Sequence, residues 1–320
     1  MRILILTLIL YTALNFSDLS TPFVRHHDWN GVRYGLIARN YIRYGLFTTK
    51  LGQVENAGKV SPSEFYFNTH YPPLLPLLLA GSFKIFGESH FSARLVPFTA
   101  SLISATFLYL IAKNFFSPQT SILSLLFLMA TPMFIYFARI PTHEPLVLAF
   151  SLATIYYYLR LRLRLSLLFY FLACLTSWPA FLLGPLLYIY YKVTAKKAQP
   201  VSLLFFVIPI TVFLLHLLHT RILTGSFLGG GLGQIFLFRL NVGNVAAEYL
   251  FTFWQFVRKE FTWLHAYFTW PLVILSGIWF LNSIFRFRSL ANEQKRRHLI
   301  LYLLLPFGLW YALVFRNVAY

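Results

Sequence analysis

Long apolar runs, separated by short polar breaks, follow one another over most of the chain. Many of them are about 14 to 22 residues long, close to the roughly 20 residues that a helix needs to cross the hydrocarbon core of a bilayer. They are too long, and too little interrupted by polar alternation, for the strands of a membrane barrel. The runs therefore predict an all-α fold, a polytopic transmembrane helical bundle.

The composition is typical of a membrane protein and indicates which class of anionic partner it binds. Hydrophobic residues make up 58% of the chain and charged residues 11%, whereas charged residues make up roughly a quarter of a soluble domain. The formal net charge is +18, but the basic residues stand between apolar runs, which argues against nucleic-acid binding. Lipid phosphate is the nearest anionic partner. The single cysteine, Cys174, cannot form an intrachain disulfide.

Three basic clusters set the orientation of the predicted crossings. Arginine and lysine beside a span mark the cytoplasmic side, so we place residues 160–164, 192–197 and 286–297 inside. The first apolar run is interpreted as a retained helix, because no small-x-small cleavage site of a signal peptide follows it. The predicted crossings are residues 1–16, 92–112, 120–138, 145–159, a hairpin of two short helices over 166–191, 201–219, 268–285 and 299–315.

One apolar run, residues 71–86, does not fit this alternation. As a helix it would be about 24 Å long, and it carries Pro72, Pro73 and Pro76 near its start. We therefore expect it to lie in or dip into the outer leaflet, so that residues 17–90 form one long outer region.

The outer regions are expected to contain a surface helix and loops. Residues 29–46 show helical periodicity, which is typical of a helix lying on the membrane surface, with a simple interfacial anchor as the alternative. Residues 45–68 are interpreted as a loop. In a second outer region, residues 221–262, the glycine-rich stretch 225–233 lacks the Lys-Ser/Thr of a phosphate loop, and we interpret it as a mobile lid or substrate-contacting loop. The apolar stripe of the helix comprises Tyr34, Ile37, Ala38, Tyr41 and Ile42, and its polar side Arg33, Asn40 and Arg43.

The acidic residues point to chemistry on the outer face. The chain has nine of them, and the predicted crossings place all but Glu293 outside. An acid beside a membrane segment is a candidate functional residue. Two of them stand in polar breaks that also carry cations and imidazoles: Asp28 in Arg25-His26-His27-Asp28-Trp29 and Glu144 in Arg139-Ile140-Pro141-Thr142-His143-Glu144-Pro145.

Asp28 admits three interpretations. It is a candidate general base that deprotonates a hydroxyl or amine nucleophile. It is equally placed to cap the helix that begins at Trp29. With His26 and His27 it offers half of a divalent metal site, although adjacent histidines do not easily converge on one ion.

The other candidates also have a functional and a structural interpretation. Arg139, His143 and Glu144 combine a cation, a titratable donor and an acid at the mouth of a span, or form a simple interfacial ion pair. Arg94 either contacts a phosphate with two hydrogen bonds or extends to the headgroups. His70 either donates to an oxyanion or caps its loop.

Four segments of the chain carry a further signal: DWNGVRYGLIARNYIRYGLF, HYPPLLPLLLAGSFKIFG, SARLVP and ARIPTHEPLVLAFSLATIYYYL. Together they resemble GT-C superfamily glycosyltransferases. The resemblance is greatest to the group of dolichyl-phosphate-mannose protein mannosyltransferases and lipid A aminoarabinose transferases, and it is specific over about residues 25–190. It implies that Asp28 is catalytic and that Glu144 is a second acid. It also places a His-x-Pro-Pro motif at His70 and an Ala-Arg-Leu motif at Arg94.

The chain departs from that group at several positions. Trp29 follows Asp28 where many relatives have an acidic pair, and the second acid is glutamate where aspartate is usual. Thr176-Ser177 stands where a Thr-Lys motif is expected. The chain ends at Tyr320, directly after an outward crossing, where relatives usually continue with more helices. We therefore expect a shortened member or a fragment.

The resemblance implies an integral membrane glycosyltransferase with one GT-C-like domain over residues 1–320. Such an enzyme moves a sugar from a polyprenyl-phosphate donor to a protein, lipid or glycan acceptor in a single inverting displacement. The active site would be extracytoplasmic, at the plasma membrane if the protein is prokaryotic. Asp28 would act on the acceptor, and Arg94, Arg139 or Arg316 would stabilise the leaving phosphate.

No nucleotide or other cofactor is expected, because the donor is a lipid; a divalent metal is left open. One alternative is a transporter or flippase of anionic lipid or lipid-linked sugar, which predicts midplane ionisable residues and repeated halves that the sequence lacks. The other is a noncatalytic membrane partner.

Overall fold

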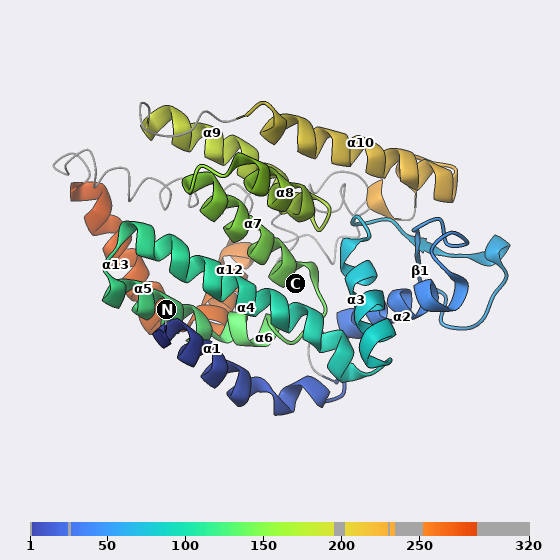
Figure 1. Cartoon of the computed structure of the whole chain (residues 1–320), viewed down its shortest axis with the longest axis horizontal. Coiled ribbons are helices and arrows are strands. Elements are labelled where there is room, and N and C mark those ends of the chain that lie inside the picture. Colours follow the sequence, from blue (N-terminus) through green and yellow to red (C-terminus); the bar gives the residue numbers. More distant parts are fainter. Residues whose placement is uncertain (1, 25–26, 195–201, 230, 234–251, 287–320) are drawn as a thin grey trace. The chain divides into compact units, whose positions relative to one another are not determined.

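The structure is a computed structural model that describes residues 2–24, 27–194, 202–229, 231–233 and 252–286. The chain divides into two units, which are described separately: residues 1–130, 134–184 and 202–231, and residues 131–133, 185–201 and 232–320. Helices dominate the described residues (Figure 1). The first unit contains α1 (Arg2–Asn15), α2 (Asp28–Tyr44), α3 (Leu74–Phe86), α4 (His90–Phe115), α5 (Pro118–Ala130), most of α6 (Pro132–Phe137), α7 (His143–Leu159), α8 (Leu163–Cys174) and α10 (Leu204–Thr224), the strands β1 (Gln53–Val54) and β2 (Phe67–Asn68), and the 3-10 turns η1 (Ser17–Ser20), η2 (Pro62–Glu64) and η3 (Trp178–Leu182).

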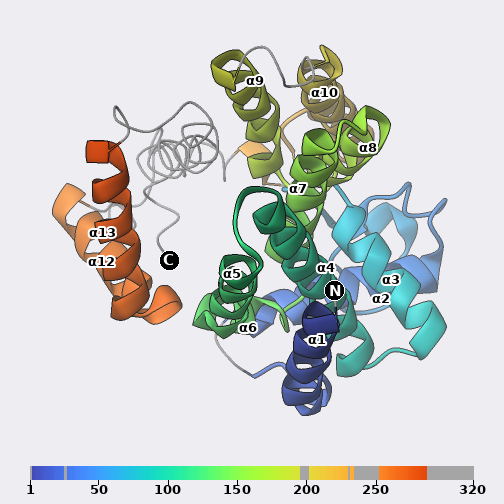
Figure 2. The same ribbon diagram turned by 60° about the vertical axis from the view of Figure 1, so that its left-hand side comes forward.

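The second unit contains most of α9 (Leu183–Thr194) together with α12 (Phe253–Phe268) and α13 (Trp270–Arg286). A capping box starts α12: the Thr252 hydroxyl accepts from the Gln255 amide at 3.2 Å, and Gln255 Oε1 accepts from the Thr252 amide at 2.8 Å. Helices α12 and α13 pack against each other (Figure 2). Within the predicted outer region 221–262, residues up to Thr224 belong to α10 and residues from Phe253 onward belong to α12.

Helix α4 organises the first unit. Ser89 caps it, because the Ser89 hydroxyl accepts from the Ser92 amide at 3.2 Å. Its 26 residues correspond to about 39 Å of helix, and they pack against α7, α5 and α3. One core cluster joins α4 to α1 and α5, with the rings of Tyr11 and Phe98 stacked 6.0 Å apart. Helix α4 thus contacts helices that come both before and after it in the chain.

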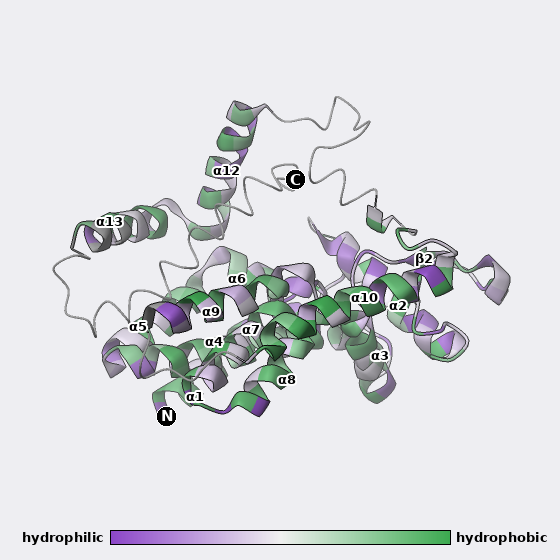
Figure 3. Cartoon of the chain, turned by 90° about the horizontal axis from the view of Figure 1, so that it is seen from above, coloured by the Kyte–Doolittle hydropathy of each residue, from purple (hydrophilic) through white to green (hydrophobic). Residues whose placement is uncertain are grey.

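Among the described residues, α4 and α10 are long and apolar enough to cross a bilayer. They coincide with two predicted crossings, and apolar residues run along both (Figure 3). Helices α1, α3, α5 and α8 are apolar but shorter. The 13 residues of α3 span about 20 Å, less than the roughly 30 Å of a hydrocarbon core. Its position in the outer leaflet stays a prediction.

Two further predicted crossings are interrupted in the structure. The crossing over residues 120–138 is broken at Thr131, between α5 and α6. The hairpin over residues 166–191 has its predicted break, because α8 ends at Cys174 and η3 follows. The last predicted crossing, residues 299–315, lies outside the described residues.

Helix α2 forms where the periodicity predicts it, but its apolar stripe faces protein. Tyr34, Ile37, Ala38 and Tyr41 are buried in one cluster with residues of α3, α4 and α7. Ile42, assigned to the same stripe, is 50% exposed. The expectation of a helix lying with its aromatic side on lipid is therefore wrong for these four residues. The physical reason is that α3, itself strongly apolar, covers the stripe.

The predicted loop 45–68 contains a two-stranded antiparallel ribbon. Gln53 pairs with Asn68, and Val54 pairs with Phe67. Gly52, beside the ribbon, is tightly enclosed: a Cβ atom there would lie 2.6 Å from the Phe67 ring and 2.9 Å from Leu223. A side chain at this position would push the ribbon away from α10.

Asn40, which the periodicity places on the polar side of the helix, joins α2 to the ribbon region. It is fully buried, and its Nδ2 donates to the carbonyls of Val54 and Asn56, each at 2.9 Å. Replacing Asn40 by alanine should lower the free energy of unfolding by about 1–3 kcal/mol, because buried carbonyls lose their donor. Thermal unfolding in detergent measures the loss. Asn30→Ala changes a half-buried residue of the same helix and is the control. An equal effect of both changes would contradict this role.

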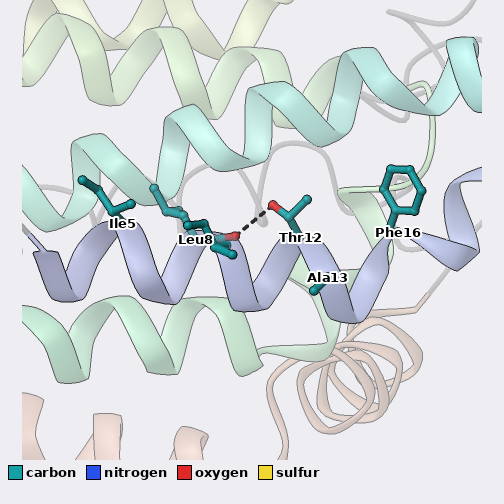
Figure 4. Close-up of a pocket in the computed structure, with 6 residues that line it drawn as sticks. Ile5, Leu8, Thr12, Ala13 and Phe16 are labelled. Atoms are coloured by element: carbon teal, nitrogen blue, oxygen red, sulfur yellow. Dashed lines mark hydrogen bonds between the residues drawn. The ribbon is translucent and has the colours of Figure 1, made fainter.

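An apolar groove runs along α1. It is lined by Ile5, Leu8, Ile9, Thr12, Ala13 and Phe16 (Figure 4). The Thr12 hydroxyl in this groove donates to the carbonyl of Leu8 at 2.8 Å. The groove therefore presents a mainly hydrophobic surface, as expected of a helix in contact with acyl chains.

Candidate active site

A small polar cavity forms where four separate segments of the first unit meet. These segments are η1, the start of α2, the start of α4 and the turn between α6 and α7. Three residues singled out in the sequence, Asp28, Arg94 and Arg139, come together here. The full lining is Asp18, Thr21, Asp28, Arg94, Tyr136, Arg139 and Ile140.

Asp28 is the first residue of α2 and is 3% exposed. Its Oδ2 accepts a hydrogen bond from the Val24 amide at 2.8 Å and lies 3.6 Å from Arg94 Nη2. The N-cap position belongs to His27, which adopts a left-handed backbone with φ +63°. Asp28 is therefore held in place by the polar segment before the helix and by the guanidinium of α4, as a positioned carboxylate requires.

Arg94 is buried, and protein groups surround its guanidinium. Nε donates to the carbonyl of Thr21 at 3.3 Å and Nη2 to that of Pro22 at 3.1 Å. Nη1 donates to the carbonyl of Arg139. The guanidinium also lies over the Phe23 ring, 4.2 Å from its centroid. All three guanidinium nitrogens of Arg94 thus donate to backbone carbonyls of the protein. This geometry favours a role in positioning Asp28 over a role in binding phosphate.

Arg139 pairs with an acid that the sequence motifs did not single out. Its Nη1 forms an ion pair with Asp18, and its Nε donates to the carbonyl of Ile135 at 3.2 Å. Asp18 lies in the polar segment directly after the first apolar run, which is the signal that could have found it. The cavity therefore holds two carboxylates and two guanidiniums in opposite-charge pairs.

A second cluster of aromatic and imidazole groups surrounds His143. This side chain is 4% exposed, and its ring centroid lies 4.9 Å from that of Tyr34 and 4.2 Å from that of Tyr71. Tyr34 follows Asp28 by six residues, or about 9 Å along α2. Burial raises the pKa of Tyr34 well above its usual value, so the phenol stays protonated. Helix α2 therefore contributes Asp28 to the cavity and Tyr34 to this cluster.

The other sequence candidates occupy different places. His70 packs against Tyr71, with ring centroids 4.1 Å apart, and its carbonyl accepts from Trp178 Nε1 at 2.9 Å. Glu144 is exposed in the first turn of α7 and does not line the cavity of Asp28. Arg316 and His26 lie outside the described residues. Within the described part of the chain, no group of three His, Cys, Asp or Glu side chains is arranged to hold a metal ion.

Comparison with known proteins identifies the fold. Residues 70–182 match the family model described as dolichyl-phosphate-mannose-protein mannosyltransferase. The crystal structure of ArnT from Cupriavidus metallidurans bound to undecaprenyl phosphate matches with a TM-score of 0.56 and 17% identity, covering 99% of this chain and 59% of that chain. The chain has the GT-C fold of ArnT. The resemblance drawn from the sequence is thus confirmed.

The likeness to ArnT has limits in extent. The chain spans about three fifths of the length of ArnT. The apo crystal structure of the same ArnT matches with a TM-score of 0.48 and 18% identity, covering 97% of this chain and 59% of that chain. No curated protein matches the sequence. The family match includes Arg94, Arg139 and His143, whereas Asp18 and Asp28 precede it.

Proposed function

We propose that the chain is an integral membrane glycosyltransferase that takes a sugar from a polyprenyl-phosphate donor and transfers it to an acceptor at the outer face. The observation that carries the proposal is the buried carboxylate of Asp28, held beside two guanidiniums in a polar cavity of a GT-C fold. The structure of ArnT bound to undecaprenyl phosphate and the mannosyltransferase family match support a lipid-linked donor. The sequence-based orientation supports the outer face.

The proposed reaction is a single displacement at the anomeric carbon of the donor sugar. The acceptor oxygen or nitrogen forms a bond to this carbon while the bond from the carbon to the phosphate oxygen breaks. Asp28 takes the proton of the acceptor, and polyprenyl phosphate leaves with the bonding electrons. Because the attack comes from the face opposite the leaving group, the configuration at the anomeric carbon inverts.

Arg139 is the better candidate for the leaving phosphate. Negative charge grows on the phosphate oxygen in the transition state, and a preorganised cation stabilises it. Among the described residues, the contacts of Arg139 use Nε and Nη1, whereas all three nitrogens of Arg94 contact protein. In this proposal Asp18 orients Arg139, and Arg94 positions Asp28. The role of Glu144 as a second acid and that of His70 as a donor to an oxyanion stay predictions.

Reconstitution tests the proposal. The purified full chain in proteoliposomes is given undecaprenyl-phosphate-linked sugars and candidate acceptors, and released undecaprenyl phosphate is measured. We expect acceptor-dependent release. Arg139→Met should lower the rate by about 10²-fold, the effect of removing one preorganised donor. Movement of intact lipid-linked sugar between leaflets without any cleavage would instead favour the transporter alternative.

A further inference from the structure

A short loop between α2 and the β1–β2 ribbon, residues 45–51, displays apolar side chains on the surface. Phe47 is 98% exposed, Leu46 43% and Leu51 44%. Single exposed apolar side chains are ordinary on a protein surface, but a group of them marks contact with another molecule or with a membrane. The described part of the chain leaves this apolar tip uncovered.

The 45–51 loop has a defined shape. The Lys50 amide donates to the carbonyl of Phe47 at 3.0 Å. The Leu51 amide donates to the carbonyl of Leu46, also at 3.0 Å. Lys50 and Leu51 adopt a left-handed backbone, with φ +52° and +57°, which residues other than glycine keep only where the surroundings impose it. The turn therefore holds the exposed side chains in one place.

The loop is attached to the C-terminal end of α10. His219 Nε2 lies 2.7 Å from the carbonyl of Lys50, and Nε2 is the donor because a carbonyl only accepts. At Gly52, directly after the loop, a Cβ atom would lie 2.9 Å from Leu223. Phe47 and Lys50 close one turn, so their Cα atoms are within about 7 Å of each other. The apolar tip therefore lies near the last turns of α10, at the end of this helix beside the ribbon (Figure 1).

This end of α10 belongs at a bilayer surface. The helix has 21 residues, or about 32 Å, which matches the roughly 30 Å of a hydrocarbon core. Leu215, Leu218 and Ile222 lie within one turn of His219 and are 58%, 50% and 57% exposed. Exposed aliphatic side chains on a crossing helix face lipid. The tip of the 45–51 loop thus continues the lipid-contacting surface of α10.

Two exposed basic residues flank the tip, Lys50 in the loop and Arg221 on α10. The Arg221 guanidinium lies over the Phe227 ring, 4.7 Å from its centroid. Among the described residues, neither cation forms an ion pair with an acid. Basic side chains at the end of a crossing helix extend to the headgroups, where lipid phosphates attract them. Lipid therefore offers what the tip and the two cations each require.

We propose that the 45–51 loop is a membrane anchor. Phe47, with Leu46 and Leu51 beside it, inserts among the acyl chains next to the end of α10. Lys50 and Arg221 contact the phosphates of the same leaflet.

The anchor reaches the helix that carries Asp28. The Gly45 amide donates to the carbonyl of Tyr41 at 3.0 Å, and the Tyr41 hydroxyl donates to the carbonyl of Leu51 at 2.9 Å. Tyr41 itself belongs to the buried cluster that joins α2 to α3, α4 and α7. Lipid contact at the loop therefore holds the C-terminal end of α2 at the bilayer surface. This inference goes beyond the proposed function, and its test requires no turnover.

Spin labels on the full-length protein test the anchor in nanodiscs of phosphatidylcholine and phosphatidylglycerol. Cys174, which is fully buried, is replaced by alanine, and a nitroxide is attached to Phe47→Cys. The fold should be retained, because the side chain of Phe47 packs against little of the protein. Collision rates with oxygen, which concentrates in hydrocarbon, and with a water-soluble nickel complex give the depth. We expect the label about 5–10 Å below the phosphates, the depth of interfacial apolar side chains.

Two further labels are the matched controls. Ala57→Cys changes an exposed residue of the same outer segment with polar neighbours, and its label should collide mainly with nickel. Leu214→Cys changes a side chain of α10 that is 59% exposed, and its label should collide mainly with oxygen. Lys50→Glu should move the label at position 47 toward water, because a carboxylate is repelled by lipid phosphates.

Several results would overturn the anchor. A label at position 47 that meets nickel as often as the Ala57→Cys label stands in water. A label screened from both reagents is covered by protein, and dipolar coupling between two labels would identify a second copy of the chain. Nickel access at Leu214→Cys would remove α10 as a crossing helix, and the anchor with it. An unchanged depth in Lys50→Glu would overturn the phosphate contact. Failure of sugar transfer would change none of these readouts.

Discussion

Replacing Asp28 by asparagine is expected to reduce sugar transfer from the polyprenyl-phosphate donor by about 10²- to 10⁴-fold, the usual contribution of a general base. Asparagine has nearly the same shape and keeps an oxygen that can accept from the Val24 amide. Arg94 also keeps its three backbone carbonyl partners. The fold should therefore survive while the proton acceptor is lost.

Release of undecaprenyl phosphate by the purified Asp28→Asn protein measures this effect. Glu88→Gln is the control, because Glu88 belongs to an exposed ion pair with Arg39, away from the cavity. The control should retain wild-type turnover. Turnover of Asp28→Asn at the wild-type rate would remove Asp28 as the base and leave it a structural residue.

The second large effect concerns stability. Replacing Arg94 by methionine should lower the free energy of unfolding by about 3–5 kcal/mol, because it leaves the buried carboxylate of Asp28 without its cation. Both side chains of this pair are at most 5% exposed. Three backbone carbonyls at Thr21, Pro22 and Arg139 would lose their donors as well. Thermal and denaturant unfolding in detergent give the comparison.

Arg39→Met provides the matched control for this prediction. Arg39 also pairs with an acid, but the side chains of Arg39 and Glu88 are 46% and 42% exposed, and exposed pairs contribute about 0–1 kcal/mol. The double change Asp28→Asn with Arg94→Met should recover part of the stability. A different result would change the role of Arg94. If Arg94→Met and Arg39→Met have the same free energy of unfolding, and Arg94→Met nevertheless loses turnover of the donor, then Arg94 contacts the phosphate, which is one of the two interpretations drawn from the sequence.

The difference between these interpretations of Arg94 shows where sequence reasoning is limited. An arginine near the start of a span predicts a cation at headgroup level, and the structure places it at the start of α4. Its partners, however, are 73 and 45 residues away along the chain, at Thr21 and Arg139. Only the fold brings these carbonyls around the guanidinium. The same holds for the pair of Asp18 with Arg139.

Helix α2 shows the limit for surfaces. Its periodicity correctly predicts a helix with an apolar stripe, because side-chain spacing is a local property of the chain. The sequence of α2 does not determine what covers this stripe, because a bilayer and an apolar neighbouring helix such as α3 would both bury it. In the same way, the sequence places Asn40 on the polar side of the helix. In the structure Asn40 is buried and donates to two backbone carbonyls, those of Val54 and Asn56.

For this protein, the amino-acid sequence alone was enough for the helical class, the break within residues 166–191 and the resemblance to GT-C enzymes. It also singled out Asp28, whose role stays a prediction. These follow from run length, helical period and short motifs, which are properties of neighbouring residues. Tertiary packing decided the pairing of Asp28 with Arg94, the pairing of Asp18 with Arg139 and the position of Glu144 away from the cavity. The physical reason is that burial, charge pairing and hydrogen-bond satisfaction depend on which distant segments meet.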